Sequence, residues 1–469
     1  MRVMDHAVGT GSEIDGFRLG ELIHVGSMAS IYRLTGPLGP LPLVMKIPRL
    51  GPGERAVNVI GFEVCRMILG ALAQSRHHPT LVAYGDVETI PYLVMEFVDG
   101  TRLSDWVDRA PLSTEEIVRV GIAFALALLD LHRQDVVHLD LKPTNVLYRK
   151  DGEVVLIDFG LAHHAHYPDL LAEELRIPVG NWVYMAPEQL FGVRCDPRSD
   201  IYALGGMLYE LATGRLPFGK PRSIAELRKR LYLDPVPPRA IAAETPEWLQ
   251  EIILRCLEVD ARERYASVEQ VAFDLANPSG VVLTERASRQ HRARWWSLLR
   301  RRNRARRFEP APCPPPVSQP RLTRVTVVAL APGESDELVR EALRGAARQV
   351  ATSDSVCRIA CVTVVPPAIS LSGEGDDNSA TGRHIKRLVE LRRWAKPLGL
   401  PEERLTYHVL EAEKPAQALV DYVKMNDVDH ILLGAAIRGP AANRLTGVCA
   451  HVVMEVPCSV TVVRPQVED

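Results

Sequence analysis

The spacing of apolar residues divides the chain into segments of different character. Three runs near the start, FRLGELIHVG, ASIYRLTG and LPLVMKI, have the pattern of strands, and residues 55–74 then follow a helical pattern. A further apolar strand, PYLVMEFVDG, ends at a turn, and helical patterns dominate from residue 114 onward. The sequence therefore predicts a small β-rich lobe followed by a larger helical lobe, and ligands favour the cleft between such lobes.

From residue 321 the pattern changes to apolar strands that alternate with charged helices. The strands are RVTVVALAP, VCRIACVTVVPP, LTYHVLEA, HILLGAA and CSVTVVRP, with helices expected over residues 336–350, 385–395 and 415–426. This alternation is typical of a parallel, doubly wound α/β sheet. We therefore expect two domains, residues 14–276 and 321–465, joined by a linker over residues 277–320.

Composition narrows the class of protein. The 469 residues are 46% hydrophobic and 24% charged, which fits a soluble globular protein and excludes a collagen, a coiled coil or a fully disordered chain. The first residues lack the apolar core of a signal peptide, and the longest apolar helical run, residues 121–129, is too short to cross a membrane. The eight cysteines show neither a CxxC pair nor zinc-ligand spacing. We expect a reducing, cytoplasmic location and no transmembrane segment.

An ordered set of motifs in the first domain indicates phosphoryl transfer. VHLDLKPTN ends at Asn145, Asp158 opens an Asp-Phe-Gly triplet, and Ala-Pro-Glu ends at Glu188; upstream, Lys46 lies in an apolar strand and Glu63 in the helix that follows. Over residues 14–276 this set resembles the protein kinases, and the Asp-Leu-Lys-Pro run resembles the Ser/Thr rather than the Tyr kinases. The resemblance implies a two-lobed fold that uses ATP and Mg²⁺ to phosphorylate protein hydroxyls.

The resemblance assigns a role to each polar residue of the set. Lys46 would hold the α- and β-phosphates and Glu63 would pair with it, while Asp140 would accept the substrate hydroxyl proton and Lys142 would reach the transferred phosphate. Oxygen ligands for Mg²⁺ would come from Asn145 and Asp158.

Further matches concern adenine and the framework of the site. Asp200 would brace the catalytic loop through its backbone, and Arg264 would pair with Glu188. The nucleotide-binding set implied by the resemblance, with Met95 as gatekeeper and Glu96 and Val98 in the hinge, is Gly26, Ile31, Val44, Lys46, Met95, Glu96, Val98 and Leu147.

The sequence also departs from the kinase pattern. Only Gly26 of the three phosphate-loop glycines is present, and Leu139 replaces the arginine that usually precedes the catalytic Asp. Residues 161–186 contain neither Ser nor Thr, so we expect a non-RD kinase that is not switched by phosphorylation of its activation segment. Asn181 stands where the family usually has Thr. The alternative is a catalytically weak pseudokinase scaffold that signals through its C-terminal domain.

Two other polar clusters, one of histidines and one of arginines, are candidates for binding. His163, His164 and His166 suggest a mobile, solvated loop more than a metal site. Residues Arg286–Arg307 contain ten arginines and no acidic residue, which leaves the rest of the chain at −12 against −2 overall. We favour a solvated tether there. The alternatives are docking on an anionic membrane or acidic protein, through Trp295, Trp296, Leu298 and Leu299, with nucleic acid least favoured. Residues 310–320, with six prolines, would extend over roughly 30 Å.

The last domain resembles the universal stress proteins over residues 321–465, in a fusion that looks bacterial. Its nucleotide-binding members carry an Asp after the first strand and a glycine-rich loop, but this chain has Leu330 at the first position. In the loop Gly434 and Gly447 are kept, whereas Ile437 and Val448 replace a glycine and a hydroxyl residue. We expect a regulatory or homodimerising module rather than a second ATP site.

Overall fold

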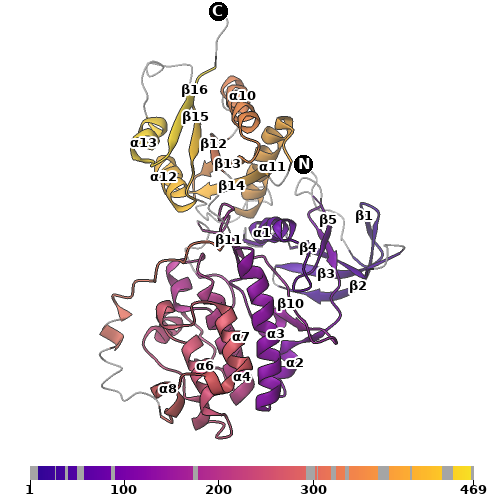
Figure 1. Ribbon diagram of the computed structural model, residues 1–469. Helices are drawn as coiled ribbons and strands as arrows, with labels where there is room; N and C mark the ends of the chain where they lie inside the picture. The colour runs from indigo at the N-terminus through magenta and orange to yellow at the C-terminus, as the bar shows by residue number, and fades with distance from the viewer. Residues whose placement is uncertain are drawn as a thin grey trace, which may run out of the picture.

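The computed structural model describes residues 9–26, 28–36, 41–49, 57–85, 90–172, 178–291, 301–303, 305–317, 324–332, 337–367, 380–401, 404–435 and 447–465. Three bodies are visible in Figure 1: a β-rich lobe, a helical lobe below it and an α/β domain above both. The predicted fold class, two lobes followed by a doubly wound α/β domain, is confirmed.

The β-rich lobe is an antiparallel sheet with one helix packed beside it. The described strands have the order β1-β2-β3-β4-β6-β5. A small apolar cluster that includes Leu19, Met45 and Val94 packs on one face of this sheet. Its elements are β1 (Glu13–Ile14), β2 (Phe17–Val25), β3 (Ala29–Thr35), β4 (Leu43–Pro48), α1 (Val57–Ala71), β5 (Leu81–Tyr84) and β6 (Leu93–Glu96).

The helical lobe is built around two long buried helices, α3 and α4. Helix α3 begins with a reciprocal capping box between Ser113 and Glu116, and α4 ends where Gly214 takes a left-handed conformation, with φ of 65°. Its helices and strands are β7 (Thr101–Arg102), α2 (Leu103–Val107), α3 (Thr114–Arg133), β8 (Val136–Val137), β9 (Val146–Tyr148), β10 (Val154–Leu156), β11 (His163–His164), α4 (Arg198–Thr213), α5 (Ile224–Leu227), α6 (Glu247–Cys256), α7 (Val268–Ala276) and α8 (Glu285–Ser288).

The C-terminal domain has a parallel sheet with the described strand order β14-β13-β12-β15-β16. Every pairing in it is parallel, as the alternation of strands and helices predicts. Its elements are β12 (Val325–Leu330), α10 (Glu337–Ser353), β13 (Arg358–Val365), α11 (Ala380–Ala395), β14 (Leu405–Glu411), α12 (Pro415–Met425), β15 (His430–Gly434), α13 (Val448–Glu455) and β16 (Ser459–Val463).

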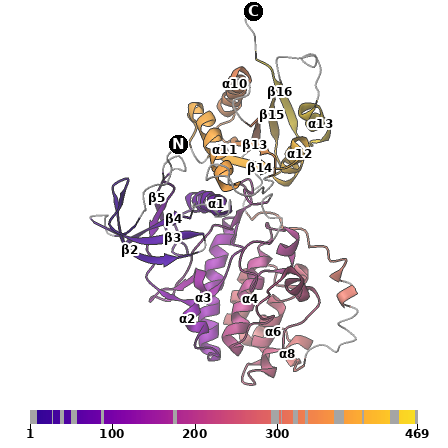
Figure 2. The same cartoon turned by 180° about the vertical axis from the view of Figure 1, so that it is seen from behind.

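The two domains share an interface at helix α1. Figures 1 and 2, which view the molecule from opposite sides, both place α1 directly beneath α11 and β14. One hydrophobic cluster runs through both domains and includes Ile60 of α1 together with Leu388 and Tyr407 of the C-terminal domain. Continuous apolar burial of this kind couples the position of α1 to the C-terminal domain.

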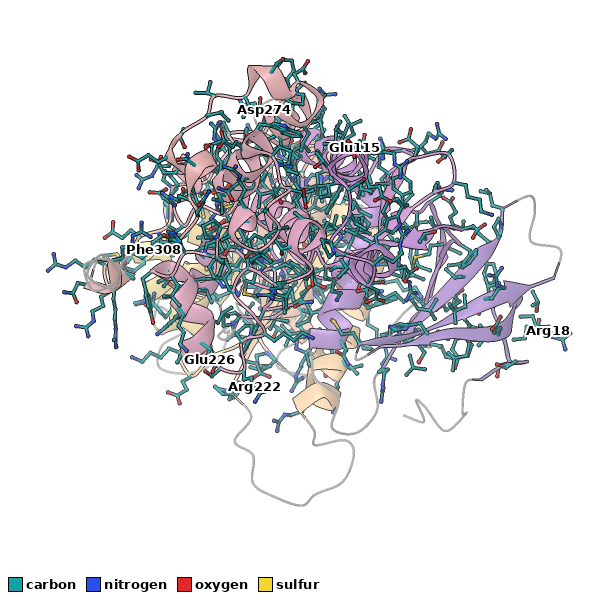
Figure 3. The ribbon with its side chains drawn as sticks, turned by 90° about the horizontal axis from the view of Figure 1, so that it is seen from below. Arg18, Glu115, Arg222, Glu226, Asp274 and Phe308 are labelled. Carbon is teal, nitrogen blue, oxygen red and sulfur yellow. A yellow bond between two sulfur atoms is a disulfide. The ribbon has the colours of Figure 1, made fainter. Side chains whose placement is uncertain are left out.

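The linker is attached to the helical lobe where it is described. Phe308, at the periphery of that lobe in Figure 3, packs its ring 5.3 Å from Phe191. A disulfide joins Cys313 to Cys195, with 5.8 Å between their Cα atoms, and Arg286 forms ion pairs with Glu251 and Glu258. The expectation of a solvated tether over Arg286–Arg307 is therefore wrong at Arg286, whereas residues 302, 303, 306 and 307 are exposed as expected. The apolar patch expected at Trp295, Trp296, Leu298 and Leu299 lies outside the described residues.

Candidate active site

The catalytic loop brings its polar side chains together around Asp140. One carboxylate oxygen of Asp140 accepts a hydrogen bond from the backbone N–H of Asn181 at 2.9 Å, and the other accepts one from Nζ of Lys142, also at 2.9 Å. Asn145 donates through Nδ2 to the backbone carbonyl of Asp140 at 2.9 Å. These contacts fix both the loop and the direction of the carboxylate.

A buried carboxylate on helix α4 positions this loop. Asp200 accepts hydrogen bonds from the backbone N–H groups of His138 at 2.8 Å and Leu139 at 3.0 Å, and it lies 3.0 Å from the His132 imidazole. Leu139 is buried and has a φ of 63°, a conformation that costs energy for a non-glycine residue. The predicted brace is confirmed, and His132 is a third partner that sequence reasoning missed.

A second framework contact was also predicted correctly. Arg264 donates two hydrogen bonds to the Glu188 carboxylate, at 2.7 and 2.8 Å, and both side chains are almost fully buried. Ser199 donates a third, at 2.7 Å. Burial raises the pKa of Glu188, but the Arg264 charge and the hydrogen bonds from Arg264 and Ser199 together outweigh it, so the net pKa is lowered and the carboxylate stays ionised.

Lys46 and Asp158 form the polar centre on the other side of the cleft. Their Nζ and Oδ1 atoms are 2.6 Å apart. Burial would lower the pKa of Lys46, but the surrounding acidic groups, Asp158 foremost among them, together outweigh it and the net pKa is raised. The Lys46 ammonium lowers the pKa of Asp158 in turn, against the effect of burial. Both groups are therefore charged at neutral pH.

The register of the sheet places the nucleotide-binding candidates beside Lys46. Ile31 lies opposite Lys46, and Val44 lies opposite Met95. Since Val44 and Lys46 are two residues apart on β4, all four belong to the same face of the sheet. Across the cleft, Val98 and Leu147 belong to another apolar cluster.

Two nucleotide-binding candidates remain, Glu96 at the end of β6 and Gly26 in the turn between β2 and β3. Glu96, in the hinge, forms an ion pair with Arg149 at 2.6 Å. Gly26 begins a turn in which its N–H donates to the Ala29 carbonyl at 2.9 Å, and Ser27, next to it, lies outside the described residues. A Cβ on Gly26 would lie 3.3 Å from that same carbonyl oxygen, so the turn favours glycine.

Glu63 does not form the ion pair that the kinase resemblance implies. Its Oε1 accepts a hydrogen bond from Arg392 of the C-terminal domain at 2.7 Å, and its Oε2 accepts one from Arg66 at 3.2 Å. No ion pair joins Glu63 to Lys46, and both residues are among those described. Lys46 is paired with Asp158 instead. The expected Lys46–Glu63 contact is thus absent from this arrangement because a residue 329 positions away takes the carboxylate.

The described parts of the activation segment, residues 158–172 and 178–188, are held by contacts with the rest of the protein. Asp169 pairs with Arg194 at 2.6 Å, and Gly180, with a φ of 115°, brings the backbone close to Asp140. His163 and His164 form strand β11, which pairs with β8, and His166 lies 2.9 Å from the Asp135 carboxylate. The expectation of a solvated histidine loop is therefore wrong. Burial lowers the pKa of His164 to about 3, so this ring is neutral.

Comparison with known proteins agrees with the two domains. A family model for the protein kinase domain matches residues 68–274, and one for the universal stress protein family matches residues 323–464. Among curated proteins, the Ser/Thr-protein kinase Pkn1 of Myxococcus xanthus is 35% identical over 292 residues, covering 57% of this chain and 39% of Pkn1. PknB of Mycolicibacterium smegmatis is 30% identical over 270 residues, covering 56% of this chain and 42% of PknB.

A solved structure, that of the PknI kinase domain of Mycobacterium tuberculosis, is 20% identical with a TM-score of 0.44 and covers 59% of this chain and all of that one. The chain spans about two fifths of the length of the curated relatives it matches. It carries a protein kinase domain followed by a universal stress protein domain. Among the described residues, no helix is both long and apolar enough to cross a membrane.

Proposed function

We propose that the chain is an active Ser/Thr protein kinase that transfers phosphate from ATP to protein hydroxyls. Its domains would be residues 14–276 and 321–465, with a linker between them. The observation that carries the proposal is the convergence of Asp140, Lys142 and Asn145 on one loop, facing the Lys46–Asp158 pair. The charges of the two groups also act on one another, since Asp140 raises the pKa of Lys46 and Lys142 lowers that of Asp158, which supports their joint use in phosphoryl transfer.

The proposed reaction transfers the γ-phosphoryl group of ATP to a Ser or Thr oxygen. Asp140 accepts the hydroxyl proton as the new P–O bond forms and ADP leaves. Lys142, already 2.9 Å from Asp140, offsets the negative charge on the phosphoryl oxygens. Lys46 binds the α- and β-phosphates, and Ile31, Val44, Met95 and Leu147 provide the apolar surface for adenine, beside Gly26, Glu96 and Val98.

The donor atoms of the cleft fit Mg²⁺. Asn145 donates through Nδ2, which leaves its amide oxygen as the atom able to ligate a cation. Asp158 remains ionised and 37% of its side-chain surface is exposed, so it can exchange Lys46 for a metal. Bound Mg²⁺ would neutralise phosphate charge, and Asn145 and Asp158 would hold it.

Labelled ATP and a generic protein substrate test the proposal directly. Asp140→Asn removes the base without changing its size, so transfer should fall by at least about 100-fold. Circular dichroism and thermal unfolding should match wild type. A folded mutant that transfers phosphate at the wild-type rate would remove Asp140 from the mechanism.

The pseudokinase scaffold is the second candidate. The separation of Glu63 from Lys46 favours it, as do the two missing phosphate-loop glycines. A wild-type chain that binds Mg·ATP but transfers no phosphate under any condition would select this alternative.

Regulation and partners belong to the same proposal. We regard the kinase as non-RD, because Leu139 is fixed by Asp200 and has no charge to bind a phosphate. Its substrates would be Ser/Thr proteins in the cytoplasm. Docking of Arg286–Arg307 on an anionic membrane or an acidic protein, and homodimerisation through the C-terminal domain, stay predictions. Low-salt co-sedimentation with anionic vesicles would test the first, and light scattering the second.

A further inference from the structure

The C-terminal domain contacts the two parts of a kinase that must be correctly placed for catalysis, helix α1 and the activation segment. Three of its side chains do so: Arg392 of α11, Arg358 at the start of β13 and Asn426 directly after α12. They come from separate elements, and none belongs to a motif that the sequence analysis identified.

The contact of Arg392 with Glu63 is an enclosed ion pair. The two side chains are each 9% exposed, and their nearest atoms are 2.7 Å apart. The Arg392 guanidinium also lies over the Tyr407 ring, 5.1 Å from its centroid, which orients it from within its own domain. Either charge would destabilise the folded state if it stayed buried without its partner, so the pair stabilises the present position of α1.

Both oxygens of Glu63 are used in this position. Arg392 takes Oε1 and Arg66 takes Oε2, while Lys46 is 2.6 Å from Asp158. The Glu63 carboxylate therefore points toward Arg392 and Arg66, and a direct ion pair with Lys46 requires its side chain or α1 to move. Arg66 belongs to α1 itself and moves with it, so the bond that opposes a shift of α1 relative to the C-terminal domain is that of Arg392.

The activation segment is fixed from the same side. Arg358 lies 3.6 Å from the Tyr167 ring centroid and donates to the His166 carbonyl at 2.8 Å. Asn426 accepts a hydrogen bond from the Asp169 N–H at 2.8 Å. A shift of the C-terminal domain thus changes the surroundings of α1 and the activation segment together.

We propose that Arg392 is a positioning residue of the kinase site, which holds Glu63 away from Lys46 and keeps the enzyme in a low-activity arrangement. Release of Arg392 lets Glu63 pair with Lys46, which then binds the nucleotide phosphates in a fixed direction. The inference rests on the proposed function only for its turnover readout, since nucleotide affinity tests it independently.

The test compares the full-length chain with Arg392→Met, Arg392→Lys and Arg393→Met. Arg393 is its neighbour on α11 and is exposed. Arg393→Met therefore makes the same Arg-to-Met replacement without removing the ion pair to Glu63. Mg·ATP affinity by calorimetry and kcat and KM for phosphate transfer are measured for each. Arg392→Met should bind Mg·ATP roughly five- to tenfold more tightly and raise kcat/KM for ATP by a similar factor. Arg392→Lys and Arg393→Met should stay near wild type.

A double mutant separates positioning from loosened packing. In the Arg392→Met, Glu63→Gln chain the gain should vanish, because the freed side chain can no longer form an ion pair with Lys46. A gain that persists without the Glu63 charge would overturn the inference, as would Arg392→Met having wild-type affinity and turnover. If Arg392→Met does not fold, Arg392→Gln, which keeps a long polar side chain but removes the charge, should give the same gain in Mg·ATP affinity, and an unchanged affinity would count against the inference.

The two proposals fail differently. If no variant transfers phosphate but Arg392→Met binds Mg·ATP more tightly through Glu63, the proposed kinase activity is refuted and the positioning role of Arg392 is supported. If every variant transfers phosphate equally and binds Mg·ATP equally, the proposed kinase activity is supported and the proposed role of Arg392 is refuted.

Discussion

The catalytic loop and helix α1 both belong to the active site, yet they are positioned in different ways. The loop is fixed inside its own domain, where Asp200 accepts from the backbone of His138 and Leu139. The functional carboxylate of α1, Glu63, is bound by Arg392 of the other domain. The loop is therefore already arranged for chemistry, whereas α1 is arranged by the C-terminal domain.

The difference indicates that the catalytic loop provides the chemistry, whereas the position of α1 controls how active the site is. The loop is held by buried hydrogen bonds within its own domain, and its link to the C-terminal domain is indirect, through the activation segment and the Asn181 N–H. A helix held by an interdomain ion pair and shared apolar packing changes whenever the second domain moves. We therefore expect substitutions at the loop to remove activity, and substitutions at the interface to change its level.

Among changes outside the residues that take part in the chemistry, the largest effect is expected from Asp200→Asn. Both carboxylate oxygens accept backbone N–H groups, so an asparagine must place its own NH₂ against one of them. Stability should fall by about 2–4 kcal/mol, and phosphate transfer by at least about tenfold. Urea unfolding and a transfer assay measure both, with the exposed Glu115→Gln on α3 as control (Figure 3). Unchanged transfer would mean that the loop does not depend on this brace.

A smaller effect is expected from acid, to which the buried His408 of the C-terminal domain contributes alongside His164 of the kinase domain. Burial lowers the pKa of His408 to about 3, although Asp169 opposes the shift. The folded state keeps this ring neutral while the unfolded chain protonates it below about pH 6.5. Its stabilising contribution is complete above pH 6.5 and is lost as pH falls toward 3. Stability should drop by about 2–3 kcal/mol between pH 7 and 4, and His408→Gln should flatten that slope. An equal slope in the mutant would contradict this.

The smallest effect is expected from phosphatase treatment. Residues 161–186 offer no Ser or Thr, and Leu139 cannot pair with a phosphate, so activity should be unchanged after complete dephosphorylation. Tyr167→Phe should also change turnover little, because the ring and not the hydroxyl contacts Arg358. Mass spectrometry of the segment is the control. Loss of activity, with recovery when a residue between 158 and 188 is rephosphorylated, would show a conventional switch.

The sequence predicted the parts of the site whose partners belong to the same set of motifs. Asp200 braces the loop and Arg264 pairs with Glu188 as expected, because kinase-like spacing brings those residues together in any chain of this fold. It could not predict the partner of Glu63, since Arg392 lies in the second domain and no pattern marks an arginine on α11 as an interface residue.

Other differences have similar physical reasons. Three histidines in a short polar stretch suggest a solvent-exposed loop. In the structure β11 pairs with β8 and the three side chains are half-buried. The Cys195–Cys313 disulfide has no spacing signal, because its two residues are 118 positions apart and meet only when the linker folds back on the helical lobe. The doubly wound sheet, by contrast, follows directly from strand and helix periodicity.

Hydrogen exchange on the full-length chain tests the separation of loop and helix most directly. Wild type and Arg392→Met are compared at residues 57–71 of α1 and residues 136–148 of the catalytic loop. The account predicts altered protection across α1 in the mutant and unchanged protection in the catalytic loop, since only α1 is bound by Arg392. Equal protection of α1 in both proteins, or a change of the same size in the catalytic loop, would contradict it.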